Sequence, residues 1–217
     1  MRKTSNKYKY LLCAELAFSF AVLPSLLSIY KVRSLIYSVL VALSIICFII
    51  LKKYYNYSFT KDLNLRAVNR RFIKELFPRI LTVYLTLFFF TYLVIPAKLF
   101  SFPTERPSVW FIVMIWYPLF SVLPQEFLYR SYFYHRFKVL FSKRYLWIVS
   151  GVLFGWAHII LQNWVAISFT VIGGLFFART YERTQSLAAA IFEHALYGCW
   201  VFTLGLGVYF YHGLAVK

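Results

Sequence analysis

The feature that most constrains this chain is a series of seven long apolar stretches separated by polar, mostly basic segments. A helix of about 20 apolar residues crosses a bilayer core about 30 Å thick. Stretches of this kind lie at 11–30, 34–51, 80–96, 109–128, 145–161, 164–178 and 187–211. Apolar residues make up 61% of the chain and charged residues 14%, too few to cover a soluble globule. The sequence therefore predicts an all-α membrane protein, a polytopic bundle of about seven transmembrane helices in which residues 1–217 form a single domain.

The C-terminal end of the fourth stretch can be read in two ways. The segment 126–142 either extends this span past the membrane or forms a separate helix after Pro124, which would make eight helices. With straight helices rising 1.5 Å per residue, Glu126 and His158 would differ in depth by about 15 Å. We therefore expect a bend at Pro118 or Pro124 that brings the two side chains level.

The distribution of positive charge predicts the orientation of the chain in the membrane. The chain has 24 basic and 7 acidic residues. With a cytoplasmic N-terminus, the inner segments carry the basic residues of 1–9, 52–79, 136–144 and 179–183. The outer loops then hold only Lys31, Arg33, Lys98, Arg106 and Lys217. This asymmetry predicts a multi-pass protein of the cell membrane with its N-terminus in the cytoplasm.

The basic residues lie between apolar runs rather than along one amphipathic face, so we expect no nucleic-acid partner. The partner that they indicate is the lipid bilayer. We interpret the stretch 52–79 as an anchor on the anionic inner leaflet. The alternative is a surface that guides a substrate. The first apolar run is too long for a signal peptide and has no evident cleavage site, so we expect an uncleaved first span.

Ionisable side chains inside apolar stretches are costly and are candidates for a functional site. Glu126 and Arg130 are four residues apart, so they project from one helical face and can pair. They form either a structural ion pair at the membrane border or a carboxylate that Arg130 positions to act on a water molecule.

Two histidines in later stretches extend this group. His158 shares a helical face with Gly151 and Gly155, and a Gly-x-x-x-Gly pair lets another helix approach closely. His194 follows Glu193, which points about 100° away and either orients a neighbouring ligand or pairs with Arg183 or another basic side chain. Each histidine either takes part in chemistry or is hydrogen-bonded to a neighbouring helix as part of the packing.

Glu126, His158 and His194 on three adjacent helices suit two kinds of chemistry. They could bind a metal ion, with zinc as the candidate, that acidifies a water molecule. Alternatively, Glu126 acts as a base while one histidine holds the water and the other donates to an oxyanion. The residues alone leave both alternatives open.

These motifs, in this order and on successive spans, resemble the CPBP family of intramembrane endopeptidases. That family is related to the CAAX-prenyl endopeptidase and to the Abi bacteriocin-immunity proteins. Its pattern is Glu-Glu-x-x-x-Arg, then Phe-x-x-x-His, then His-x-x-x-Asn or a small residue. The corresponding residues here are Gln125-Glu126-x-x-x-Arg130, Phe154-x-x-x-His158 and His194-x-x-x-Gly198. The resemblance covers about 105–211 as a catalytic core, and the first three spans match only in general hydrophobicity.

The resemblance implies a peptidase, glutamic or metallo in type, that hydrolyses a peptide bond of a membrane-associated peptide or protein near or within the bilayer. It assigns Glu126 as the base or a metal ligand, and His158 as the residue that positions the water. His194 would stabilise the oxyanion, and Arg130 would orient Glu126. The substrate, including whether it is prenylated, is left open.

Two departures from the family pattern bear on activity. Gln125 replaces the glutamate credited with activating the water, and an amide cannot act as a base, so Glu126 must take over or activity is lost. Gly198 replaces the asparagine that donates to the oxyanion, which leaves His194 to act with a backbone group or alone. We therefore predict a divergent active endopeptidase. The alternative is a catalytically inactive member that acts as a membrane immunity or scaffold protein.

Overall fold

The structure is a computed structural model that describes residues 6–31 and 35–210. Six helical stretches have the length and apolar character to cross a membrane: Asn6–Ile29, Ile36–Tyr55, Arg70–Val94, Pro107–Phe137, Lys143–Leu161 and Trp164–Thr184. A seventh apolar helix, Leu187–Thr203, is shorter. The described residues contain no strand. The predicted all-α, polytopic membrane bundle is confirmed. Four basic residues used to predict the orientation, Arg2, Lys3, Arg33 and Lys217, lie outside the described residues.

The N-terminal half supplies three long helices and a short connecting segment. The elements in order are α1 (Asn6–Ala17), the π-helical turn η1 (Phe18–Val22), α2 (Leu23–Ile29), α3 (Ile36–Tyr55), α4 (Phe59–Leu63), η3 (Leu65–Ala67) and α5 (Arg70–Val94). Asn56 ends α3 in the left-handed region, at φ 48°. The Asn69 side chain caps α5 by accepting the Phe72 N–H at 3.1 Å. The helix that contains the predicted third span, 80–96, therefore begins ten residues earlier, within the basic stretch.

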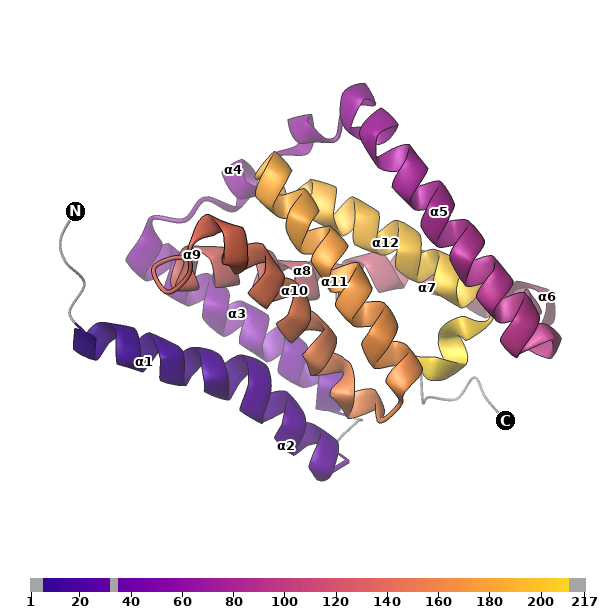
Figure 1. Cartoon of the computed structure of the whole chain (residues 1–217), viewed down its shortest axis with the longest axis horizontal. Coiled ribbons are helices and arrows are strands. Elements are labelled where there is room, and N and C mark those ends of the chain that lie inside the picture. Colours follow the sequence, from indigo (N-terminus) through magenta and orange to yellow (C-terminus); the bar gives the residue numbers. More distant parts are fainter. Residues whose placement is uncertain (1–5, 32–34, 211–217) are drawn as a thin grey trace.

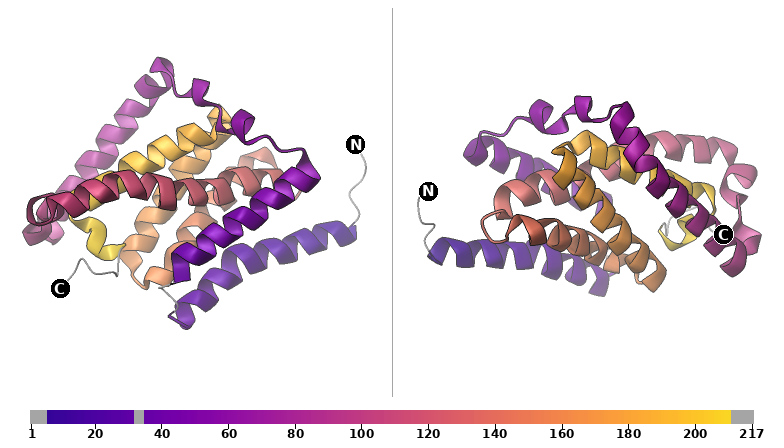
Figure 2. Two further views of the ribbon diagram at one scale, coloured as in Figure 1. Left: turned by 180° about the vertical axis from the view of Figure 1, so that it is seen from behind. Right: turned by 45° about the horizontal axis from the view of Figure 1, so that its top comes forward.

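The fourth span is one long helix interrupted by two π-helical segments. After the short elements η4 (Pro96–Lys98) and α6 (Ser101–Glu105), it comprises α7 (Pro107–Tyr117), η5 (Pro118–Val122), α8 (Leu123–Glu126), η6 (Phe127–Tyr132) and α9 (Phe133–Phe137). Figure 2 shows it crossing the back of the molecule. Pro118 and Pro124 lack the N–H that a regular helix uses, and η5 begins at Pro118. Residues 126–137 thus extend the fourth span, 138–142 form the turn that follows it, and the segment forms no separate helix.

This extension also brings Glu126 and His158 to similar depths. Glu126 lies 11 residues before the helix ends at Phe137, which is about 16 Å along the axis. His158 lies 15 residues after α10 begins at Lys143, which is about 22 Å. Because a short turn joins these two helix ends, the expected depth difference falls to about 6 Å. The fourth helix, which is interrupted at the prolines and continues to Phe137, therefore accounts for the similar depths of Glu126 and His158.

The last three long helices form the centre of the bundle. They are α10 (Lys143–Ala157), α11 (Trp164–Thr184) and α12 (Leu187–Thr203), joined in part by η7 (His158–Leu161) and followed by η8 (Leu206–Tyr209). Figure 1 shows them between α1–α2 on one edge and α5 on the other. A Cβ on Gly151 would lie 2.8 Å from the Leu175 Cα, and one on Gly155 would lie 2.6 Å from the Val171 Cα. The close helix approach predicted from this Gly-x-x-x-Gly pair is confirmed.

Candidate functional site

Glu126 and Arg130 form an ion pair that is fully enclosed by protein. Both side chains are 0% exposed, and the Arg130 Nε donates to the Glu126 Oε2 at 2.8 Å. Arg130 also donates from Nη1 to the Ser150 Oγ at 2.6 Å and from Nη2 to the Gly174 carbonyl at 3.3 Å. Its guanidinium lies 5.4 Å from the centre of the Phe154 ring. The predicted i, i+4 pairing is confirmed, and the guanidinium is held by both α10 and α11.

The second oxygen of Glu126 binds a histidine of α12. The His194 Nδ1 lies 2.9 Å from the Glu126 Oε1. Because Arg130 balances the carboxylate charge, the carboxylate accepts and Nδ1 carries the proton. The neutral ring then has a lone pair on Nε2, which accepts from the Tyr117 hydroxyl at 3.1 Å. The Phe177 ring stacks on the imidazole, with centroids 4.4 Å apart. Glu126 and Phe177 thus fix both the tautomer and the orientation of His194.

His158 presents a second imidazole from the end of α10. Its Nδ1 lies 2.9 Å from the Phe154 carbonyl oxygen, so Nδ1 donates and Nε2 is left as an acceptor. The Phe154 ring contacts both histidines, with centroids 4.9 Å from His158 and 5.3 Å from His194. Phe154 of the Phe-x-x-x-His motif therefore holds both imidazoles in place.

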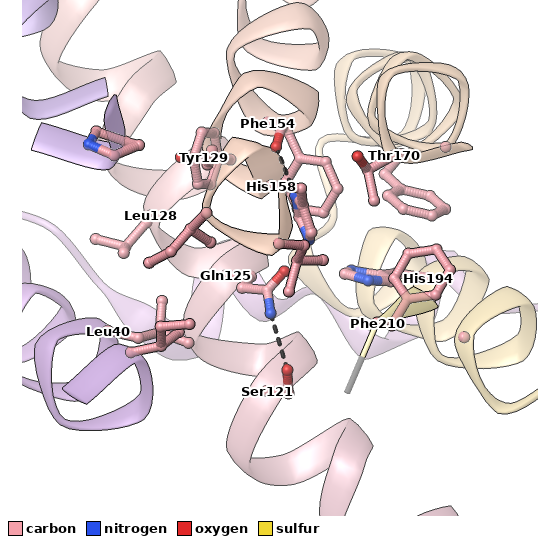
Figure 3. Close-up of a pocket in the computed structure, with 18 of the residues that line it drawn as sticks. Leu40, Ser121, Gln125, Leu128, Tyr129, Phe154, His158, Thr170, His194 and Phe210 are labelled. Carbon is pink, nitrogen blue, oxygen red and sulfur yellow. Dashed lines mark hydrogen bonds between the residues drawn. The ribbon is translucent and has the colours of Figure 1, made fainter. Parts of the chain in front are cut away.

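Gln125 points into the space between the two histidines (Figure 3). Its Nε2 donates to the Ser121 Oγ at 2.8 Å. Its Oε1 is buried and has no hydrogen-bond partner within the described part of the chain. A buried acceptor without a partner is costly, so this oxygen is available to a donor from a bound molecule or water.

The polar groups meet at one end of a large apolar cavity of about 980 Å³. Tyr117, Ser121, Gln125, His158 and His194 line it. Much of the remaining wall is apolar and comes from α2, α3, α5 and α11, including Leu23, Leu27, Leu40, Leu43, Val83, Leu87, Phe169 and Phe176. The lining includes neither Glu126 nor Arg130, which lie behind His194. The structure thus brings three of the predicted site residues, Glu126, Arg130 and His194, into one hydrogen-bonded chain, and His158 faces the same cavity.

Two other glutamates found in apolar stretches have structural partners. Glu193 is fully buried and pairs with Arg79 at 2.9 Å, so its partner is a basic side chain but not Arg183, which pairs with Glu75 at 3.0 Å. Glu15, near the start of the first span, pairs with Arg136 at 2.5 Å. Arg136 is more than 120 residues away in the chain, and sequence spacing gave no indication that the two helices adjoin.

A third carboxylate, that of Asp62 in α4, ties the connecting segment to the core. It accepts hydrogen bonds from the hydroxyls of Tyr57 at 2.8 Å, Tyr181 at 2.5 Å and Ser131. Burial, together with the Asp62 charge, raises the pKa of the Tyr57 phenol well above its usual range, so this hydroxyl stays a donor. These contacts hold α4 against η6 and α11.

The predicted donor set does not fit a zinc site. Both carboxylate oxygens of Glu126 and both ring nitrogens of His194 already have protein partners. Across residues 6–31 and 35–210, no group of three or more His, Cys, Asp or Glu side chains is arranged to hold a metal ion. We therefore derive no reaction step through a metal.

Tyr117 could not be recognised as a site residue from the sequence. This residue is one of 18 tyrosines and lies within the apolar run 109–128, where an aromatic side chain is ordinary. The one available signal was Gly198, whose lack of a side chain leaves room for another group.

Comparison with known proteins finds a family similar to the part of the chain that carries the motifs. Residues 107–200 match the family model described as type II CAAX prenyl endopeptidase Rce1-like. This match confirms the resemblance predicted from the three motifs, all of which lie within it, and the family is one of membrane endopeptidases. Searches of the curated proteins and of the solved structures give no match.

Proposed function

We propose that this protein is an intramembrane endopeptidase in which His194, oriented by Glu126, activates the attacking water. The observation that carries the proposal is the hydrogen bond between the His194 Nδ1 and the Glu126 Oε1, which leaves the Nε2 lone pair at the cavity. A buried carboxylate behind an imidazole holds the productive tautomer and stabilises the imidazolium that forms. The Rce1-like match over residues 107–200 supports peptide-bond hydrolysis as the reaction.

The reaction follows from the protonation of the two imidazoles. A water at the cavity end gives one proton to the His194 Nε2 and uses its other O–H to bind the His158 Nε2. The hydroxide attacks the peptide carbonyl carbon and forms a tetrahedral oxyanion. As the C–N bond breaks, the leaving amine takes the proton back from the His194 Nε2. The acid product and the amine then leave the cavity, and both histidines are again neutral.

This proposal changes the roles that the resemblance implies. Glu126 does not line the cavity, so we assign it to orienting His194 instead of taking a proton from water itself. Arg130 keeps the Glu126 carboxylate charged, since it pairs with the other oxygen. His158 keeps the role of positioning the water. His194 changes from an oxyanion donor to the base, because its donor nitrogen faces Glu126.

The shape of the cavity bears on the substrate. Its volume of about 980 Å³ lies at the upper end of ordinary ligand pockets, and much of its wall is apolar. Such a cavity suits a peptide that carries a long hydrocarbon group, in line with the prenyl substrates in the family description. We also propose a cytoplasmic N-terminus, which rests on the distribution of basic residues.

One observation favours a second function. Gln125 occupies the cavity at the position where the family has a glutamate, and its amide cannot accept a proton from water. A family member that has lost this base could still bind an apolar segment in the cavity. The second candidate is therefore a catalytically inactive membrane immunity or scaffold protein.

Cleavage by the full chain in lipid vesicles separates the two candidates. The variants are wild type, His194→Gln and Gln125→Glu, with His135→Gln as the matched control. The His135 Nδ1 donates to the Ser131 carbonyl at 2.8 Å, and His135 does not line the cavity. One readout is an internally quenched farnesylated peptide ending in a CAAX sequence. The other is mass spectrometry of new C-termini in membranes of cells that make each variant.

We expect wild type and His135→Gln to generate cleavage products, and His194→Gln to slow cleavage about 10²- to 10⁴-fold. Equal cleavage by wild type and His194→Gln would reject His194 as the base. A silent wild type in both readouts, with products from Gln125→Glu, would establish the inactive binding protein.

A further inference from the structure

With Tyr117 in its observed place, position 198 on α12 has no room for a side chain. A Cβ at this position would lie 2.2 Å from the Tyr117 hydroxyl oxygen, 2.3 Å from its Cε1 and 2.5 Å from its Cζ. These distances are far below any tolerated contact, and they involve a ring held on another helix. The absent side chain of Gly198 is therefore the space that the end of Tyr117 occupies.

Neighbouring groups hold Tyr117 in this place. It ends α7 at the start of the π-helical turn η5. Its ring packs edge-on against Phe202, with centroids 5.1 Å apart, and it lines the cavity. Its hydroxyl lies 3.1 Å from the His194 Nε2, the atom that takes the proton in the proposed function. A reacting carbon that His194 and a bound water can reach thus lies within reach of the phenol as well.

The cavity end needs a hydrogen-bond donor that the histidines do not supply. Each imidazole gives its N–H away from the reaction, His194 to Glu126 and His158 to the Phe154 carbonyl. In the resting protein both Nε2 atoms are acceptors. The proton that the His194 Nε2 later takes from water is needed by the leaving amine, so the oxyanion requires another donor. The Tyr117 O–H is a donor that points at the reaction centre. At 3.1 Å its bond to Nε2 is long for an O–H donor, so the hydroxyl can turn to a better acceptor.

We propose that the Tyr117 hydroxyl is a catalytic residue that donates to the oxyanion of the tetrahedral intermediate, in the space that Gly198 leaves free. This inference rests on the proposed function. In the free protein the hydroxyl donates to the His194 Nε2. When substrate and water are bound, the water takes that place on Nε2, and the phenol turns its O–H to the developing oxyanion without losing its proton. Glycine then replaces the family's asparagine at position 198 because the Tyr117 hydroxyl occupies that space and serves as the donor.

The first test measures the fit of Tyr117 against Gly198 and does not depend on activity. We expect Gly198→Ala in the full chain to lower the midpoint of thermal unfolding in detergent, because the added Cβ meets the Tyr117 ring. Adding Tyr117→Leu, whose side chain ends before the clash, is expected to recover most of the loss. If Gly198→Ala unfolds at the wild-type temperature, or if Tyr117→Leu gives no recovery, this packing is wrong and the inference falls.

The second test removes only the hydroxyl. Tyr117→Phe keeps the ring, and we expect it to lower kcat for the quenched farnesylated peptide about 10²- to 10³-fold. KM should change less than about twofold, since the lost bond forms only in the transition state. The matched control is Tyr134→Phe, which removes a buried hydroxyl bound to the Ala178 carbonyl at 3.0 Å, away from the cavity.

The outcomes separate this inference from the function on which it rests. If His194→Gln is inactive while Tyr117→Phe keeps the kcat of Tyr134→Phe, the endopeptidase stands and the role of Tyr117 is rejected. A loss in Tyr117→Phe that falls entirely on KM would also reject it. If His194→Gln cleaves as fast as wild type, the proposed function itself fails.

Discussion

Two buried glutamates, Glu126 in α8 and Glu193 in α12, form similar ion pairs with different roles. Glu126 and Glu193 are both 0% exposed, and each binds an arginine. Glu126 uses its second oxygen to bind His194, whose other nitrogen reaches the cavity. Glu193, with Arg79, is linked to the cavity only through the Tyr197 hydroxyl, which is not a base, and binds no imidazole. The comparison teaches that a buried Glu–Arg pair does not by itself mark an active site; the imidazole that connects one pair to the cavity does.

The remaining partners of Glu193 are hydroxyl groups. Thr180 donates to it at 2.5 Å and Tyr197 at 2.9 Å, and Arg79 adds its charge from a side chain that is 26% exposed. This network joins α5, α11 and α12. We assign it a structural role, because neither the Thr180 nor the Tyr197 hydroxyl has the basicity of an imidazole.

The largest expected difference between the two networks concerns catalysis. In Glu126→Gln, the amide can donate to the His194 Nδ1 and thereby move the ring proton to Nε2, where it blocks proton uptake. We expect kcat in the vesicle assay to fall about 10³- to 10⁴-fold. Glu193→Gln is the matched control, with kcat within about threefold of wild type. Equal losses in the two variants would remove the distinction between the networks.

The next largest effect concerns the two arginines. Arg130→Met leaves the Glu126 carboxylate buried without its cation, so we expect a loss of about 3–5 kcal/mol in the free energy of unfolding. This is measured by SDS unfolding in mixed micelles. Arg79→Met should lower the free energy of unfolding clearly less. The Arg79 side chain is partly exposed, so water can reach Glu193 once the guanidinium is removed. A larger loss in Arg79→Met would reverse the comparison.

A smaller effect is expected for Glu193→Gln in stability. The amide keeps the shape of the carboxylate but weakens charge-assisted hydrogen bonds from Thr180 and Arg79, which we expect to cost about 1–3 kcal/mol. The same unfolding measurement checks this value. A neutral result would mean that the network carries no net stability.

The partly exposed pair of Glu15 and Arg136 is expected to contribute least to the free energy of unfolding. Their side chains are 28% and 21% exposed, so water screens the charges. We expect Glu15→Gln to cost about 1 kcal/mol or less. A loss as large as that of Arg130→Met would show that exposure does not rank these pairs.

Much of the architecture could be predicted from the sequence, because apolar length and charge asymmetry are strong signals in a membrane protein. The residues Glu126, Arg130 and His194 could be predicted as a group, since charged side chains in apolar runs are rare. The contact between Glu126 and His194, and which of these residues line the cavity, could not be predicted. Which face of the fourth helix turns to the cavity depends on the π-helical turns η5 and η6, which place Gln125 rather than Glu126 at the cavity.

The partners of the other polar residues were equally hard to predict. Glu15 binds Arg136 and Glu193 binds Arg79, and both contacts join helices far apart in the sequence. Spacing along one helix cannot report such pairs. By contrast, Gly151 and Gly155 correctly predicted a close helix approach, because the pattern needed for it lies within one helix.

The position of the ring proton on His194 in the resting protein decides whether this residue can act as the base. ¹⁵N NMR of histidine-labelled protein in lipid vesicles reports which ring nitrogen carries the proton, and comparison with His194→Gln assigns the signal. We predict a neutral ring with the proton on Nδ1 and a lone pair on Nε2, and a shift of the proton to Nε2 in Glu126→Gln. A wild-type ring already protonated on Nε2 would contradict the account, because it could not accept a proton from water.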